Sequence, residues 1–399
     1  MKKFFVLYAA VLISFTVMGT LAWGQIINLE TGVTYNQTDY DDWKKGDGPY
    51  GTTTRVVLDG VTATFNSGSL VPSYFNFISG TLNVNGTVNI SPEVLSGFRG
   101  DGETLTTIFN VTDNSVLNFG TALKVQDYTG NTPMVIEKRG AGDLNFNFST
   151  TNFDTYSHVA GTTNFMKEAT GTNLSIKSGK VSVYGNMDNV TMTGGELNIT
   201  GQLNAGEFIV DNDGVAEPVV LTFNSGSSVD DENIDAPTSA VLGDNIIFNF
   251  AVNDHGSVIS SMYFDTLSLG DNDTTSFLDG VVFNITNSDS LRDFDPVNPE
   301  NNNLTPMDLL ISKNLTLDGV SLTSSSSEDV FNMINDLLAN VVVKDANPYV
   351  NWSLQVAKTN TEGGVSLQAV GLLVPEPSTW VMLLLGLAGM AIYRRRLQK

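Results

Sequence analysis

The sequence predicts an all-β body, either a right-handed parallel β-helix (a solenoid) or, as the alternative, a β-sandwich. Three observations lead to this class. Short segments of alternating apolar and polar residues recur, separated by Gly, Asn or Asp, as in the stretch from Gly80 to Ile90. The turn residues return every ~8 to 12 positions, which leaves no room for long helices. The segments also resemble one another, as the coils of a solenoid do.

The segment over 80–90 shows the alternation most clearly. One face carries Leu82, Val84, Val88 and Ile90, and the other carries Asn83 and Asn89. Period-two alternation with one apolar face is typical of half-buried strands. Similar segments occur over 179–185, 195–201 and 220–226. We therefore assign residues 25–290 to the solenoid body.

One segment of the body resembles a known repeat. Residues 138–148 run Lys-Arg-Gly-Ala-Gly-Asp-Leu-Asn-Phe-Asn-Phe. This K-x-G-x-G-x-L pattern resembles the start of the autotransporter-associated β-strand repeat. The resemblance favours the β-helix over the sandwich, although only one clear copy is present.

Residues 291–373 depart from the pattern. They begin with an irregular loop rich in Asn, Asp and Pro. Ser325 and Glu328 then stand at capping-box spacing before an apolar stripe, which predicts an amphipathic helix over 326–339. Such a helix is suited to covering an open end of the solenoid. Two alternating runs around residues 360–363 predict a closing β-hairpin.

The N-terminus has the pattern of a secretory signal peptide over 1–24. Two lysines precede an apolar run, and Ala22 and Gly24 place small residues at the −3 and −1 positions for cleavage before Gln25. The alternative is an N-terminal membrane anchor that stays attached.

The C-terminal segment, residues 374–399, has three parts. It opens with Val374, Pro375, Glu376 and Pro377 and ends with a basic cluster that includes Arg394, Arg395 and Arg396. Between them lies an uncharged, mostly apolar run over 380–393, which predicts a transmembrane helix. Fourteen helical residues rise about 21 Å, short of the roughly 30 Å hydrocarbon core, and the arginines can snorkel from the cytoplasmic side. The two prolines favour an extended, protease-accessible motif before the helix.

This order of motif, helix and basic cluster resembles the PEP-CTERM sorting signal of Gram-negative bacteria. The resemblance implies that an exosortase, a membrane transpeptidase-like enzyme, recognises Val374 to Pro377. It also implies an exported protein that is transiently anchored in the inner membrane and sorted to the cell surface, outer membrane or extracellular matrix. The alternative is an ordinary short membrane anchor that follows a Pro-Glu-Pro sequence.

The composition limits the partners. The chain has 20 Lys and Arg against 43 Asp and Glu, a formal net charge of −23. So acidic a chain repels phosphate backbones, which excludes nucleic acid as a partner. The absence of cysteine excludes disulfides, thiolate metal sites and cysteine nucleophiles.

No catalytic constellation is present in the sequence, so we predict a protein that is not an enzyme and assign no catalytic, cofactor-binding or metal-binding residue. His158 and His255 have no metal-ligand partner at helical spacing and no nucleophile motif beside them. Ca²⁺ is the one cofactor left open, because residues 211–214 and 271–273 carry oxygen ligands at alternate positions. Asx turns between strands need the same residues.

These observations predict an exported structural protein of the cell surface or extracellular matrix. Its expected partners are the exosortase-type processing enzyme, the membrane through the C-terminal helix, and exopolysaccharide or cell-surface glycans, with a role in the matrix or in adhesion. The alternative is a β-helix protein that binds or degrades polysaccharide, since acidic residues cluster at 39–42 and 230–232.

Overall fold

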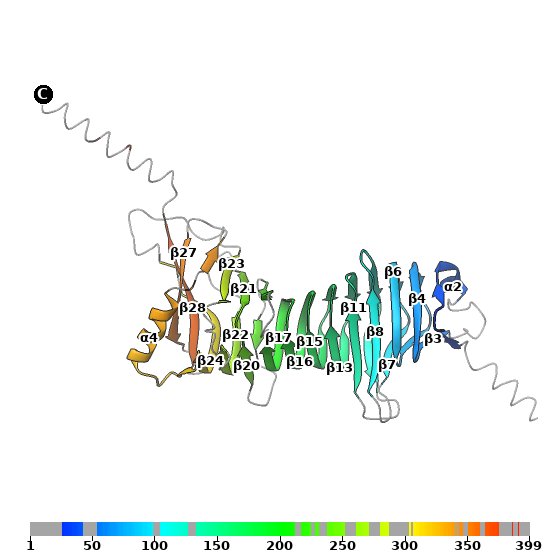
Figure 1. Cartoon of the computed structure of the whole chain (residues 1–399), viewed down its shortest axis with the longest axis horizontal. Coiled ribbons are helices and arrows are strands. Elements are labelled where there is room, and N and C mark those ends of the chain that lie inside the picture. The colour runs from blue at the N-terminus through cyan, green and yellow to red at the C-terminus, as the bar shows by residue number, and fades with distance from the viewer. Residues whose placement is uncertain are drawn as a thin grey trace, which may run out of the picture. The chain divides into compact units, whose positions relative to one another are not determined.

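The structure is a computed structural model of the whole chain. It describes residues 26–42, 54–98, 104–126, 133–211, 217–224, 228–230, 238–251, 261–270, 280–286, 303–304, 306–339, 341, 343–345, 350–359, 364–374, 385 and 390. The all-β class is confirmed, since strands dominate the described residues and short helices are few (Figure 1). The chain divides into unit 1, residues 1–197, and unit 2, residues 198–399.

Unit 1 is built from short strands and one helix. The strands are β1 (Ile26–Asn28), β2 (Thr34–Tyr35), β3 (Arg55–Leu58), β4 (Val61–Leu70), β5 (Tyr74–Phe77), β6 (Gly80–Ile90), β7 (Val94–Phe98), β8 (Leu105–Val111), β9 (Val116–Phe119), β10 (Leu123–Gln126), β11 (Met134–Arg139), β12 (Asp143–Phe146), β13 (Thr150–His158), β14 (Thr162–Phe165), β15 (Ala169–Ile176) and β16 (Lys180–Met192). The helix is α2 (Gln37–Asp42), which the sequence did not predict.

The strands of unit 1 pair in parallel, in three rows. The first row runs β1, β3, β5, β7, β10 and β13. The second runs β2, β4, β6, β8, β11, β13, β15 and β16. The third runs β6, β9, β12, β14 and β16. The longer strands β6, β13 and β16 belong to two rows each, so the chain passes from one row to the next within a strand.

Unit 2 continues this construction and ends differently. Its strands are β17 (Glu196–Val210), which begins at the unit boundary, β18 (Val219–Phe223), β19 (Ser228–Asp230), β20 (Ser239–Leu242), β21 (Ile246–Ala251), β22 (Ser261–Leu269), β23 (Val282–Thr286), β24 (Met307–Leu317), β25 (Val320–Leu322), β26 (Val343–Asp345), β27 (Val350–Lys358) and β28 (Val365–Leu373). Parallel pairing extends past residue 290 to β24 and β26. From β24 onward β25, β28 and β27 pair antiparallel, so a hairpin of β27 and β28 closes the sheet.

Helix α4 (Glu328–Leu338) lies within the range expected from the sequence and packs against β27. The predicted capping box is wrong in detail. The N-cap is Ser327 rather than Ser325, and its side chain makes no capping hydrogen bond. Phe331, Ile334 and Leu338 are buried, whereas Leu337 is 47% exposed.

The core of unit 1 consists of like side chains placed one above another. In the third row, Phe119, Phe146 and Phe165 occupy the same register position on β9, β12 and β14. Successive ring centroids lie 5.3 and 5.0 Å apart, with interplanar angles of 21° and 7°. Parallel pairing without a register shift produces this stack, since each strand sets its side chains about 4.8 Å from those of the strand with which it pairs.

The outward face of the same row carries a ladder of asparagines. Asn164 donates to Asn145, Asn145 to Asn118 and Asn118 to Asn89, each from Nδ2 to Oδ1 at 2.8 Å. The steps along the chain are 29, 27 and 19 residues. The ladder therefore holds the strands in one register although the lengths of chain between them differ, because the extra residues lie outside these strands.

Unit 2 also has a row of hydrogen-bonded polar side chains and stacked phenylalanine rings. The polar row joins Asn249 to Thr222 at 3.0 Å and Asn284 to Asn249 at 2.7 Å. Phe248 stacks on Phe283 and Phe223 on Phe250, with centroids 4.9 and 4.7 Å apart. Stacking of like residues is thus a property of both units.

Glycine forms a column at one corner of unit 1. Gly140, Gly161, Gly179 and Gly195 all adopt φ between +75° and +78°. A Cβ on Gly161 would lie 2.5 Å from the Gly140 carbonyl oxygen, and one on Gly179 would lie 2.3 Å from that of Gly161. Both the backbone conformation and the close contact with the carbonyl oxygen of the preceding glycine therefore require glycine here.

Lys138, the first residue of the K-x-G-x-G-x-L segment, is fully buried. Its Nζ donates to the carbonyl oxygens of Arg139 at 2.9 Å, Gly140 at 2.7 Å and Ala160 at 3.1 Å, so the ammonium group holds two turns together. Burial lowers the pKa of Lys138 to about 8. The motif thus has a structural explanation: its lysine closes the glycine corner.

His158 on β13 lies opposite Lys138 of β11 in the parallel register. Its Nδ1 lies 3.1 Å from Thr163 Oγ1, which also lies 2.7 Å from the Tyr156 hydroxyl, and its Nε2 lies 3.1 Å from the Gly161 carbonyl oxygen. Burial lowers the pKa of His158 from 6.5 to about 4, and the Lys138 charge acts in the same direction. The ring is therefore neutral at pH 7.

The asparagine ladder should contribute measurably to stability. Asn118→Ala removes two 2.8 Å hydrogen bonds from the middle of the ladder, and we expect the free energy of unfolding to fall by about 1–2 kcal/mol. Asn147→Ala removes an exposed amide outside the ladder, and we expect a change within about 0.5 kcal/mol. Urea titrations of both variants measure the difference, and equal losses would contradict the role of the ladder.

His158 should make stability depend on pH. Between pH 6.5 and 4 the unfolded chain binds a proton at this position that the folded chain does not. The free energy of unfolding therefore falls as the pH falls through this window. His158→Gln keeps a hydrogen-bonding side chain but does not titrate, so its pH dependence should be shallower. Urea titrations at a series of pH values compare the two proteins, and identical slopes would show that His158 contributes nothing.

Candidate functional site

The C-terminal segment begins at a strand that is paired on both sides. β28 pairs with β27 along its whole length, from Lys358 opposite Val365 to Val350 opposite Leu373. On its other side it pairs with β24 as far as Ala369. The last strand before the sorting segment is therefore an interior strand of the sheet.

The end of β28 is held by further contacts. Leu372 forms an antiparallel bridge with Asn303, and the Leu304 amide donates to the Gly371 carbonyl oxygen at 2.8 Å. Leu304 and Leu373 belong to a small apolar cluster with Val350, and Trp352 packs against it. The chain is thus fixed up to Leu373, one residue before the predicted motif.

A glycine makes this packing possible. A Cβ on Gly371 would lie 2.7 Å from Leu304 and 2.8 Å from the Trp352 ring. The Trp352 indole nitrogen donates to Asp345 Oδ2 at 2.6 Å, which orients the ring over the strand. The C-terminal end of β28 therefore carries its own tight packing, separate from the stacked rows.

The predicted site residues fall mostly outside the described part of the chain. Val374 is described and half-buried. Pro375, Glu376, Pro377 and the three arginines, Arg394, Arg395 and Arg396, lie outside it, as do Ala22, Gly24 and Gln25 at the predicted cleavage site. Of the predicted transmembrane helix over 380–393, only Leu385 and Met390 are described, both helical and exposed. A search of the described residues finds no helix with the length and hydropathy needed to cross a membrane.

The acidic clusters are placed only in part. Asp39 accepts a hydrogen bond from the Asn36 amide at 2.8 Å, while Asn36 Oδ1 accepts one from the Thr38 amide at 3.0 Å, so both residues cap helix α2. Asp41 accepts from Gln37 at 2.9 Å. Most of 211–214, all of 271–273 and His255 lie outside the described residues. Within the described residues no group of three His, Asp or Glu side chains could hold a metal ion, and Ca²⁺ stays a prediction.

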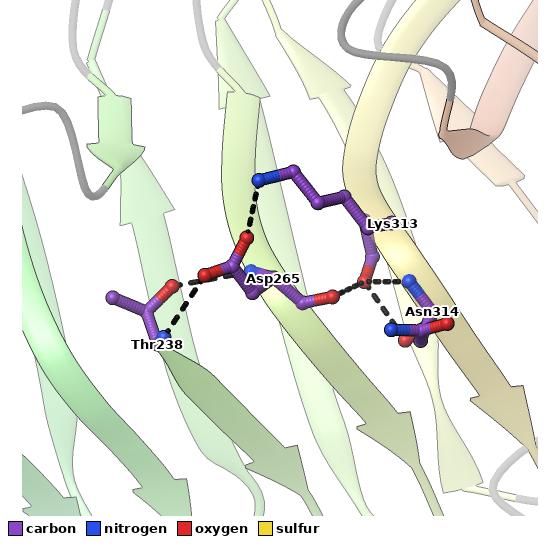
Figure 2. A network of polar contacts seen from close by, with 5 residues as sticks. Thr238, Asp265, Lys313 and Asn314 are labelled. Carbon is purple, nitrogen blue, oxygen red and sulfur yellow. Dashed lines mark hydrogen bonds and ion pairs between the residues drawn. The ribbon is translucent and has the colours of Figure 1, made fainter. Parts of the chain in front are cut away.

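The clearest charged network lies at a corner of unit 2 (Figure 2). Asp265 on β22 accepts from the Thr238 amide at 3.2 Å and pairs with Lys313 Nζ at 2.6 Å. Its own amide donates to Thr238 Oγ1 at 3.1 Å. The hydrogen bond from Lys313 lowers the pKa of Asp265. Thr238 directly precedes β20, so these contacts join three neighbouring strands of the sheet, β20, β22 and β24, and help to fix their register.

Unit 1 contains a similar contact between an aspartate carboxylate and a backbone amide of a neighbouring strand. Asp154 on β13 accepts from the Met134 amide at 2.8 Å, at the start of β11. Asp154 and Asp265 both stand in the tripeptide Phe-Asp-Thr, at 153–155 and 264–266. The sequence analysis missed these corner residues, although the repeated tripeptide could have revealed them.

Comparison with known proteins identifies the C-terminal segment. Residues 373–396 match the family model described as the PEP-CTERM protein-sorting motif. No curated protein and no solved structure matches the chain, so no homologue confirms the resemblance of the body to the autotransporter-associated β-strand repeat. The motif implies an exported, membrane-anchored protein of the cell envelope that an exosortase-type enzyme processes. Residues 373–396 therefore carry a PEP-CTERM protein-sorting motif, attached directly to the last strand of the body.

Proposed function

We propose that this chain is a structural protein of the cell surface or extracellular matrix, sorted there through its C-terminal motif. The observation that carries the proposal is the sorting motif placed directly after an interior strand of an all-β body. The sorted product is then a folded body whose attachment point lies at the end of β28.

We further propose that the body is a right-handed parallel β-helix. The parallel rows support this, because each strand pairs with one that lies about a coil further along the chain. The phenylalanine stack and the asparagine ladder support it as well, since both need equivalent positions in successive coils. The sandwich considered from the sequence would pair its strands mainly antiparallel.

Association with exopolysaccharide or surface glycans is the finer part of the proposal. The asparagines of the ladder are half-buried, and each amide keeps hydrogen-bonding capacity toward solvent after its contacts within the ladder. Amides of this kind bind hydroxyl groups. A net charge of −23 opposes polyanions, so neutral glycans are the better match.

Terminal sequencing and intact mass of the protein from its own cells test the sorting. We expect a mature chain that begins at Gln25 and ends between Pro375 and Pro377. A chain that retains residues 380–399 would show that the C-terminal helix is a permanent anchor, and the sorting part of the proposal would fail.

A point variant links processing to the motif. Glu376→Ala removes the charge between the two prolines, and we expect the unprocessed chain to accumulate in the membrane fraction. Glu362→Ala removes a nearby acid outside the motif, and we expect wild-type processing. Immunoblots of the membrane and the surface fractions compare the two, and equal processing would contradict recognition of Pro-Glu-Pro.

Incubation with polysaccharides separates the structural role from the alternative. We expect the protein to co-sediment with exopolysaccharide from its own cells and to release no new reducing ends or unsaturated sugars. Released ends across a panel of neutral and uronate-containing polysaccharides would instead favour a polysaccharide-degrading enzyme.

A further inference from the structure

Two carboxamide side chains, one in each unit, make the same contact with a strand. In α2, Gln37 Oε1 accepts from the Ser69 amide at 2.8 Å, and Gln37 Nε2 donates to the Ser69 carbonyl oxygen at 3.4 Å. In α4, Asn335 Oδ1 accepts from the Val356 amide at 2.7 Å, and Asn335 Nδ2 donates to the Val356 carbonyl oxygen at 3.4 Å. Each amide thus offers one strand residue the acceptor and donor that a peptide group of a neighbouring strand would offer.

In unit 1 this contact lies where a row runs out of strands. β4 pairs with β6 on one side as far as Leu70. On its other side β2 covers only Thr64 and Phe65. Helix α2 takes over beyond that point, beside β4 (Figure 1). The ring centroid of the buried Tyr40 lies 5.3 Å from that of Phe65. The Tyr40 hydroxyl donates to the Asn66 carbonyl oxygen at 2.9 Å.

In unit 2 the contact lies on the edge of the closing hairpin. Val356 stands opposite Leu367 of β28, which occupies one edge of β27. The other edge of β27 at Val356 faces α4, whose Phe331 is buried. Lys358 Nζ lies 5.3 Å from the centre of the Phe331 ring. Apolar packing therefore holds the helix in place while Asn335 occupies the strand edge.

We propose that α2 and α4 are edge caps that prevent a strand of a second copy of this chain from joining the sheet. Unpaired amides and carbonyls at a strand edge are a template for strand addition. Here the template is strong, because each of the two strands is already paired along one side, β4 with β6 from Val61 to Leu70 and β27 with β28 from Val350 to Lys358. A second copy is the fitting occupant, since its strands carry the same alternation and would extend the rows of like residues.

Removal of the amide from α4 tests this role. Asn335→Leu introduces a residue of similar size and higher helix propensity but loses both hydrogen bonds to Val356. We expect at least a two-fold rise in weight-average mass with increasing concentration, measured by light scattering on the full chain in detergent. Asn332→Leu adds the same apolar side chain at an exposed position of α4, and we expect the mass of the wild-type monomer at every concentration.

A second change distinguishes strand addition from misfolding. Val356→Pro in the Asn335→Leu background removes the edge N–H that a new strand would bind, and proline is tolerated at strand edges. We expect this double variant to return to the monomer mass with native-like circular dichroism. The proposal is overturned if Asn335→Leu stays monomeric at all concentrations, if the wild type already associates, or if the double variant associates as strongly as Asn335→Leu.

Discussion

The structure depends on parallel pairing that keeps its register from one strand of a row to the next. Where the register holds, such pairing places each side chain directly above its counterpart, about 4.8 Å away. The side chain at a given position must therefore pack well against a like side chain in the neighbouring strand on each side. Phenylalanine satisfies this by face-to-face stacking, asparagine by donating to the next amide, and glycine by leaving room for a carbonyl oxygen. The composition, low in charge and rich in Asn, Thr and Gly, follows from this requirement.

Two polar side chains stand in an otherwise apolar column of unit 1, and hydrogen bonds to nearby turns stabilise them there. Lys138 and His158 follow Phe109 and precede Ile176 in one inward column. An ammonium group or an imidazole in an apolar column would be unfavourable without partners. Both side chains reach the glycine corner, where the carbonyl oxygens of the turns accept their hydrogen bonds. The polar groups of both buried side chains thus find their hydrogen-bond acceptors in these turns.

The all-β class and the C-terminal motif could be predicted from the sequence, because both depend on residues that are close together in the chain. Alternation such as that of residues 80–90 depends only on which residues are apolar. The direction of pairing could not be obtained in this way, because a sandwich has the same period. Helix α2 was missed since its six residues are polar except for Tyr40, whose burial against Phe65 depends on the fold. Asp154 and Asp265 were missed because their backbone partners, Met134 and Thr238, lie beside them only once the strands have paired.

The position of the sorting motif follows from the same construction. β28 is an interior strand, and Leu373 is packed in an apolar cluster. Pro377 is the fourth residue after Leu373, and these four steps of the chain span at most about 14 Å when fully extended. An enzyme that recognises Pro-Glu-Pro must therefore work within that distance of the folded hairpin, or the end of β28 must first separate from β27. The pairing that stabilises the body thereby also limits how the sorting enzyme can approach its motif.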